Sequence, residues 1–134
     1  MSLAALHPQI VHFVIALLCA GVLFRWASLT GRAAFTGPAA AALLLAGSCG
    51  AVLAVKSGTD AHGPVERVPG ARAAVVEHEE WGNRTRNIFL VVAVLEIAAL
   101  VPAARRWRKG THVASALVGL AGAAALYEAG APRR

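Results

Sequence analysis

The chain has 134 residues, of which 57% are hydrophobic and 15% are charged. Together with a mean hydropathy of +0.61, this composition excludes an ordinary soluble domain of this size and indicates one small integral membrane domain. The net charge of +6 comes largely from arginines beside apolar runs, where they favour cytoplasmic loops and anionic lipid head groups, so nucleic acid is not an expected partner.

The first predicted helix covers residues 10–27, an almost wholly apolar run that Arg25 interrupts late. Its length suits a helix that crosses about 30 Å of hydrocarbon. Because no basic region precedes the run and no small-residue cleavage site follows it, we expect a retained span instead of a signal peptide. Cys19 in this run and Cys49 in the next lack CxxC spacing, and we expect both to be small buried residues.

The second predicted span covers residues 38–55 and follows a turn at residues 31–37. Within this span, Gly47, Ser48 and Gly50 are small enough for a neighbouring helix to approach closely. The chain then turns polar over residues 56–70, where glycines and prolines predict a loop that contains Asp60 and His62.

The third predicted helix covers residues 72–101, and it becomes apolar from Ile88. Its charged first turns are expected at or above the membrane surface. A basic connector leads to the fourth span, residues 112–128, in which small residues stand four apart at Ser115, Gly119 and Ala123. These patterns predict an all-α fold, an integral membrane four-helix bundle that forms a single domain over residues 1–134.

The distribution of basic residues predicts an orientation. The two short loops after the first and third spans carry almost no acids but several cations, so we expect them in the cytoplasm: Arg32, Arg105, Arg106, Arg108 and Lys109. Both termini and residues 56–86 would then face the periplasm or exterior of a bacterial or archaeal inner membrane. Because alternate spans run in opposite directions, four histidines converge on that face and His112 lies on the other: His7, His12, His62 and His78.

These histidines point to haem chemistry. A six-coordinate haem b needs two neutral imidazoles on facing helices, apolar walls and cations near its propionates. A rise of about 1.5 Å per residue puts His7 and His78 closer in height than His12 and His78. The deeper His12 offers the drier site, so His12 with His78 is the preferred ligand pair, and His7 and His62 are second choices.

The remaining groups that a haem would need are also present near this face. Phe13 and Trp81 are candidate walls for the ring, and the candidate partners of the propionates are Arg67, Arg72, Arg84 and Arg86. Four histidines on one face would allow even two haems. A second hypothesis is a zinc, copper or iron site made of the same histidines with carboxylates, although no HExxH or CxxC motif supports it: Asp60, Glu77 and Glu80.

Two charges lie inside the predicted spans, Arg25 in the first and Glu96 in the third. Their estimated depths are similar and both are toward the cytoplasmic end. We expect them to form a structural ion pair between helices, in preference to a role in proton or quinone chemistry.

Three short motifs together resemble a known family. They are His7-Pro8-x-x-Val11-His12-Phe13 before an apolar span, Ser57-Gly58-Thr59-Asp60 after the second span, and His78 in the third helix. The chain resembles, over nearly its whole length, the bacterial and archaeal membrane family catalogued as domain of unknown function 2231. The resemblance implies a small four-span fold and the grouping of His7, His12, Asp60 and His78; it supplies no activity.

The expected function is that of a membrane b-type cytochrome-like electron-transfer subunit, which carries electrons between a redox partner and a quinone or larger respiratory complex. An accessory role is expected in preference to a stand-alone enzyme, because the sequence has no nucleophile elbow, P-loop or Rossmann glycine pattern. The alternative is a cofactor-free structural subunit that anchors a larger membrane complex, which the small-residue stripes also favour. A small transporter or metal-handling protein is a third hypothesis.

Overall fold

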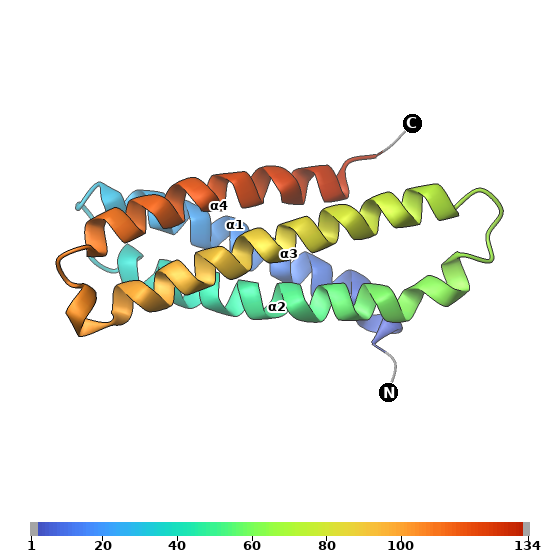
Figure 1. Ribbon diagram of the computed structural model, residues 1–134, viewed down its shortest axis with the longest axis horizontal. Coiled ribbons are helices and arrows are strands. Elements are labelled where there is room, and N and C mark those ends of the chain that lie inside the picture. The colour runs from blue at the N-terminus through green and yellow to red at the C-terminus, as the bar shows by residue number, and fades with distance from the viewer. Residues whose placement is uncertain (1–2, 133–134) are drawn as a thin grey trace.

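The computed structural model describes residues 3–132, which form four α-helices and two short 3-10 helices. The helices are α1 (His7–Leu29), α2 (Thr36–Val65), α3 (Arg72–Leu100) and α4 (Arg108–Gly130), and the 3-10 helices are η1 (Ala4–Leu6) and η2 (Pro102–Ala104). The α-helices pack lengthwise into one elongated bundle, in which α1 begins and α4 ends toward the same end (Figure 1). No strand occurs within residues 3–132. The prediction of an all-α four-helix bundle is confirmed.

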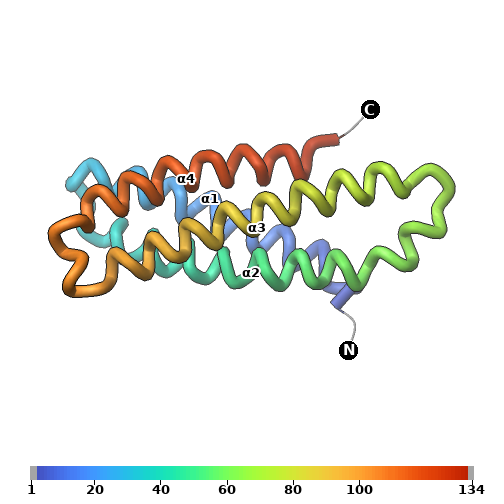
Figure 2. The backbone as a smooth tube through the Cα atoms, viewed as in Figure 1, coloured from blue at the N-terminus to red at the C-terminus, as the bar shows by residue number. Residues whose placement is uncertain are grey.

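Three of the helical stretches are long and apolar enough to cross a membrane: Ala4–Leu29, Thr36–Val65 and Arg108–Gly130. Helix α3 is not among them, because its first half carries six charged residues: Arg72, Glu77, Glu79, Glu80, Arg84 and Arg86. Its apolar part, residues 88–100, measures about 20 Å at 1.5 Å per residue. The α2–α3 turn extends along the bundle axis beyond the start of α1 and the end of α4, so the charged half of α3 reaches the end of the bundle (Figure 2).

The bundle buries several polar side chains and exposes many large apolar ones. Arg25 and Glu96 are each 1% exposed, whereas Leu23 is 70% and Val94 is 66% exposed. Every buried side-chain nitrogen and oxygen within the described residues has a hydrogen-bond partner. A bilayer stabilises this arrangement, because lipid chains solvate apolar surface and cannot form hydrogen bonds with polar groups.

The core is built where α1 and α2 approach closely. Val14, Leu18 and Val22, spaced four apart on α1, are buried and pack in one cluster with Leu44 of α2. A Cβ atom on Gly47 would lie 2.5 Å from Leu18 Cδ2, so only glycine allows this helix separation. The expected close approach at Gly47 is therefore present.

Helix α2 is longer than predicted. The expected loop at residues 56–70 is wrong over its first ten residues, because α2 continues to Val65 and contains Gly58 and Pro64. The glycine that signalled a break is instead a packing position, since a Cβ on Gly58 would lie 3.1 Å from His7 Cε1. The extension carries Asp60 and His62 on a helix.

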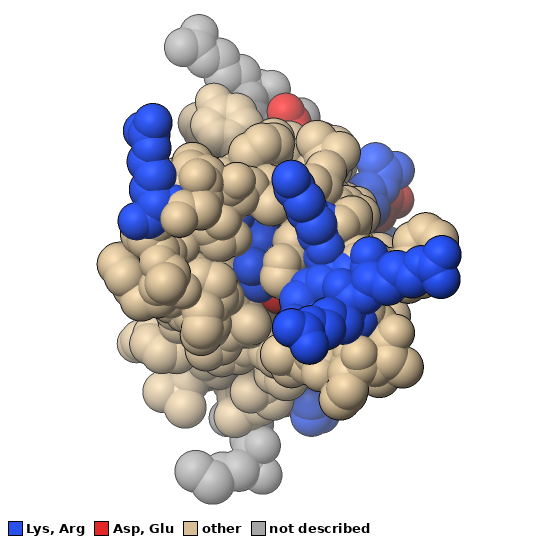
Figure 3. All heavy atoms as spheres, turned by 90° about the vertical axis from the view of Figure 1, so that its left-hand side faces the viewer, with Lys and Arg blue, Asp and Glu red and all other residues tan. Residues whose placement is uncertain are grey.

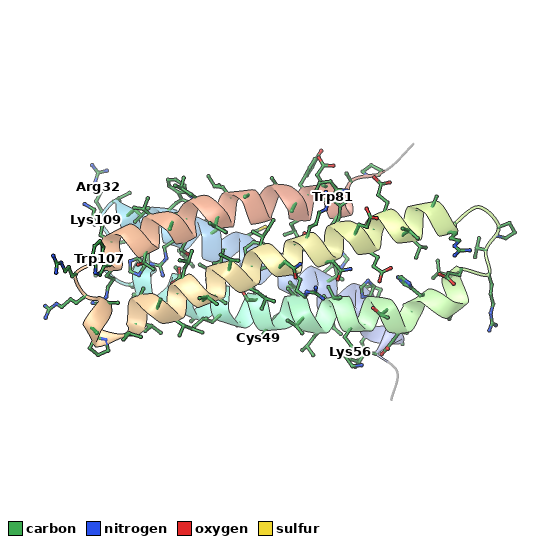
Figure 4. All side chains as sticks on the ribbon, viewed as in Figure 1. Arg32, Cys49, Lys56, Trp81, Trp107 and Lys109 are labelled. Carbon is green, nitrogen blue, oxygen red and sulfur yellow. The ribbon has the colours of Figure 1, made fainter. Side chains whose placement is uncertain are left out.

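The prediction that both cysteines are buried is also wrong. Cys19 and Cys49 are exposed on the outside of the bundle, and Figure 4 shows Cys49 on the outer side of α2. Small side chains are expected at helix contacts, but here the contact positions on α2 belong to Gly47 and Ser48, which leaves the next residue facing outward.

Candidate histidine site

Three of the four converging histidines line one pocket between the helices. His7 comes from α1, His62 from α2 and His78 from α3, and Leu126 and Ala129 of α4 close the wall. The ring centroids of His7 and His78 are 6.4 Å apart, and the ring planes are perpendicular. His62 Nδ1 lies 3.8 Å from Glu79 Oε2 at the rim. Histidines far apart in the sequence therefore meet at the end of the bundle where α1 begins.

The hydrogen bonds of His7 fix its neutral tautomer. His7 Nδ1 lies 2.8 Å from Ser57 Oγ. The Ser57 hydroxyl donates its one hydrogen to the Ala54 carbonyl at 2.9 Å, so Oγ accepts from His7 Nδ1–H. The lone pair of the neutral ring is therefore on Nε2.

His78 is held in the same way by a different partner. Its Nδ1 lies 3.0 Å from the Ala129 carbonyl oxygen, which can only accept, so Nδ1 carries the proton and Nε2 is the basic atom. Histidines that bind metals are oriented in this manner, with one ring nitrogen donating to a carbonyl or another acceptor while the other ligates. His7 and His78 thus offer two neutral Nε2 donors from two helices.

The structure does not bring His12, the first-choice ligand, into this pocket. His12 is exposed on the outer face of α1, and its Nδ1 bonds to the Pro8 carbonyl of its own helix at 2.6 Å. Phe13, predicted as a wall, is 67% exposed and is not among the lining residues. The pair that meets is the pair closer in height, His7 and His78. Depth alone misleads because it ignores which side of the helix a residue occupies.

The predicted neighbours are divided between two adjacent pockets. Arg86 lines the first, while Trp81 lines a second pocket that shares His78 and Ala129 with it. Arg84 is exposed and stacks on the Trp81 ring at 4.9 Å. Arg67 and Arg72 are exposed near the α2–α3 turn. Of the four arginines predicted to meet the propionates, Arg86 alone borders the first pocket.

The residues around the pair fit haem in their donor chemistry. Two oriented imidazoles with free Nε2 atoms are the ligand set of six-coordinate haem b, and most of the other lining residues are small or apolar. The pocket volume is about 90 Å³, and the second pocket, which is also lined by His78, measures about 380 Å³. Sites for organic ligands typically measure about 300–1,000 Å³, so the first pocket by itself encloses only part of a macrocycle.

The mixed-ligand metal site has less support. No group of three or more His, Cys, Asp or Glu side chains within residues 3–132 is arranged to hold a metal ion. Asp60, one of the proposed carboxylates, instead accepts a bond from the Leu3 backbone N–H at 3.4 Å. It ties the first turn of the chain to α2.

A second polar cluster occupies the opposite half of the bundle. Arg25 and Glu96 form an ion pair, in which Arg25 Nε donates to Glu96 Oε1 at 2.9 Å and a second guanidinium nitrogen contacts Oε2. Ser115 also donates to Oε1, at 2.5 Å. The cluster joins α1, α3 and α4, as expected for a pair at similar depths. His112, half-buried on α4, lies in this half and away from the histidine pocket.

Sequence reasoning missed the groups that orient the imidazoles. Ser57 lies in the Ser57-Gly58-Thr59-Asp60 motif, within the predicted loop. The sequence signal for its role was its position next to Gly58. Ala129 contributes only its backbone carbonyl, so no side-chain pattern could reveal it.

Comparison with known proteins agrees with this architecture. A family model described as "Predicted membrane protein (DUF2231)" matches residues 3–130. No curated protein and no solved structure gave a match. Since the matched region covers nearly the whole chain and includes all four helices and the histidine pocket, the chain belongs to the DUF2231 family of predicted membrane proteins.

Proposed function

We propose that this protein is a membrane b-type cytochrome-like electron-transfer subunit in which His7 and His78 would hold a haem b. The observation that carries the proposal is the paired imidazoles, whose Nδ1 atoms are both engaged and whose centroids are 6.4 Å apart.

Haem held there would supply a one-electron iron couple. The chain would supply the rest of the site. His7 and His78 hold the metal from α1 and α3, Ser57 keeps His7 in the ligating tautomer, and Arg86 offers a positive charge at the pocket wall. Val11, Val14 and Leu126 line the pocket with apolar side chains. Electrons would then pass through the site without bond chemistry by the protein.

The same proposal includes an orientation and partners. The cations at the basic end of the bundle favour a cytoplasmic position for that end. The histidine pocket would then lie on the periplasmic or exterior side of a bacterial or archaeal inner membrane. The pocket lies at the end of the bundle, within reach of a soluble or peripheral redox partner. A quinone or a larger membrane complex would be the other partner in electron transfer.

The test is an absorption spectrum of the purified protein after haem-supplemented expression. We expect a Soret band and, on reduction, an α-band, and we expect His7→Ala and His78→Ala each to lose most of the bound haem. His12→Ala is the matched control, because His12 lies five residues from His7 on the same helix and faces outward. His12→Ala should retain the spectrum.

Two outcomes would contradict the proposal. A colourless wild-type protein excludes haem and favours a cofactor-free anchoring subunit, which should tolerate all three alanine substitutions and copurify with partner chains. If His12→Ala abolished the haem spectrum and His7→Ala preserved it, the proposed ligand pair of His7 and His78 would be wrong.

A further inference from the structure

The charges of the bundle are divided unequally between its two ends. The connectors and the first turn of α4, at the end opposite the histidines, carry five cations and no acid: Arg32, Arg105, Arg106, Arg108 and Lys109. Glu96, the acid nearest in sequence, is buried and paired with Arg25. Residues 56–86, at the histidine end, instead contain equal numbers of acidic and basic residues. Among the described residues, the positive charge is therefore uncompensated at the first of these two ends.

The cations of this basic end are gathered on one surface. Figure 3 shows lysine and arginine side chains on the face that terminates the bundle, most of them gathered toward one side, and Figure 4 shows Arg32, Trp107 and Lys109 at this same end. Four of the five cations are exposed; the fifth, Arg108, is half-buried and donates to the Ala99 carbonyl at 2.9 Å. Both connectors therefore contribute exposed cations to the same end of the bundle.

Exposed aromatic rings accompany these cations. Phe35 and Trp107 are each 68% exposed, and the Arg106 guanidinium lies 5.6 Å from the centre of the Trp107 ring. Tryptophan prefers the level of the lipid head groups, where its ring meets both hydrocarbon and water. Guanidinium groups bind phosphate through paired hydrogen bonds. In a membrane, cations beside such rings are expected at the level of the phospholipid phosphates.

We infer that the basic end, defined as Arg32, Phe35, Arg105, Arg106, Trp107, Arg108 and Lys109, binds the head groups of anionic phospholipids in preference to zwitterionic ones. The lipid is favoured as the occupant because the cations lack protein counter-ions within the described residues and stand beside rings that mark the interface. The inference is independent of haem binding at the opposite end.

The test measures which lipids the protein retains. The full chain is reconstituted in nanodiscs of equal parts phosphatidylcholine and phosphatidylglycerol, extracted in mild detergent, and its retained lipids are quantified by mass spectrometry. We expect phosphatidylglycerol to be enriched over the nanodisc ratio at low salt and less so at high salt. In the variant R105Q/R106Q/K109Q this enrichment should fall by on the order of tenfold, because three of the cations that attract the anionic head groups are removed.

The matched control is K56Q/R67Q/R72Q, which removes three exposed cations from the other end and should retain the enrichment. Equal loss in both triple variants would show a general effect of net charge and overturn the inference. Equal retention of the two lipids by the wild type would overturn it as well. Inorganic phosphate added at millimolar concentration should not displace the retained phosphatidylglycerol; displacement would mean that the surface binds free anions and does not select a lipid.

Discussion

The identity of the ring nitrogen that carries the proton decides what His7 and His78 can do. Each ring gives its Nδ1 hydrogen to a fixed acceptor, the Ser57 hydroxyl or the Ala129 carbonyl, and this leaves each Nε2 as a base. His12 has the same internal arrangement, with Nδ1 on the Pro8 carbonyl, but it faces outward. A histidine that ligates through Nε2 thus needs its proton on Nδ1. Its position on the helix then decides whether it faces the pocket.

Ser57→Ala tests the orienting bond. The substitution removes the acceptor of His7 Nδ1–H, and loss of such a partner typically costs roughly 10- to 100-fold in metal affinity. We expect weaker haem retention in a titration of the apoprotein with haem, and a shift in the reduction potential of the fraction that binds. Ser48→Ala is the control, because Ser48 is a buried serine on the same helix that bonds to Leu44 and Phe89 carbonyls and not to a histidine. An affinity loss of the same size in both variants would assign Ser57 a packing role only.

The four helices are joined by polar contacts that cross the core at different depths. Ser48 of α2 donates to the Phe89 carbonyl of α3 at 2.9 Å, and the Trp26 indole of α1 donates to the Ala116 carbonyl of α4 at 3.2 Å. The Arg25–Glu96 pair adds a charged link between α1 and α3. In lipid, these contacts specify which helices are neighbours, since apolar faces alone would pack equally well with lipid chains.

Glu96→Gln tests the charged link. It leaves the buried Arg25 guanidinium without a counter-charge, and breaking a buried pair by removing one partner costs about 3–5 kcal/mol. We expect a lower thermal unfolding midpoint in nanodiscs for Glu96→Gln and for Arg25→Met. The double variant R25M/E96L should be more stable than either single variant, because no charge is left buried. A double variant that loses the sum of the two single effects would show that the two side chains act separately.

More of the fold than of the histidine site could be predicted from the sequence. Apolar runs interrupted by glycine, proline and arginine mark the four helices well, because each signal is local. The end of α2 was predicted wrongly because Gly58 is read locally as a break, whereas the helix continues and the missing side chain accommodates the His7 ring. The convergence of the histidines followed from topology. The preference for His12 over His7 was wrong about which histidine lines the pocket. The packing of Val14 and Leu18 against α2 sets the rotation of α1 about its axis, and this rotation turns His12 outward.

The whole molecule has one balanced end that holds the histidines and one basic end that does not. This asymmetry predicts how the bundle lies in the membrane. In a background of C19A/C49A, which removes both native thiols, Arg67→Cys at the histidine end should react with a membrane-impermeant maleimide added to intact spheroplasts. Lys109→Cys should react only after the membrane is permeabilised. The reverse pattern of labelling would invert the orientation, and labelling of both would exclude a fixed topology.

The most direct measurement of the central claim is the low-temperature electron paramagnetic resonance spectrum of the oxidised, haem-loaded protein. Two neutral imidazoles with perpendicular ring planes predict a highly anisotropic low-spin signal, because the planes of His7 and His78 stand at 90°. The signal should disappear in His7→Ala and His78→Ala and persist in His12→Ala. A high-spin signal from the wild type, or a protein that takes up no haem, would contradict the assignment of this histidine pair as a haem site.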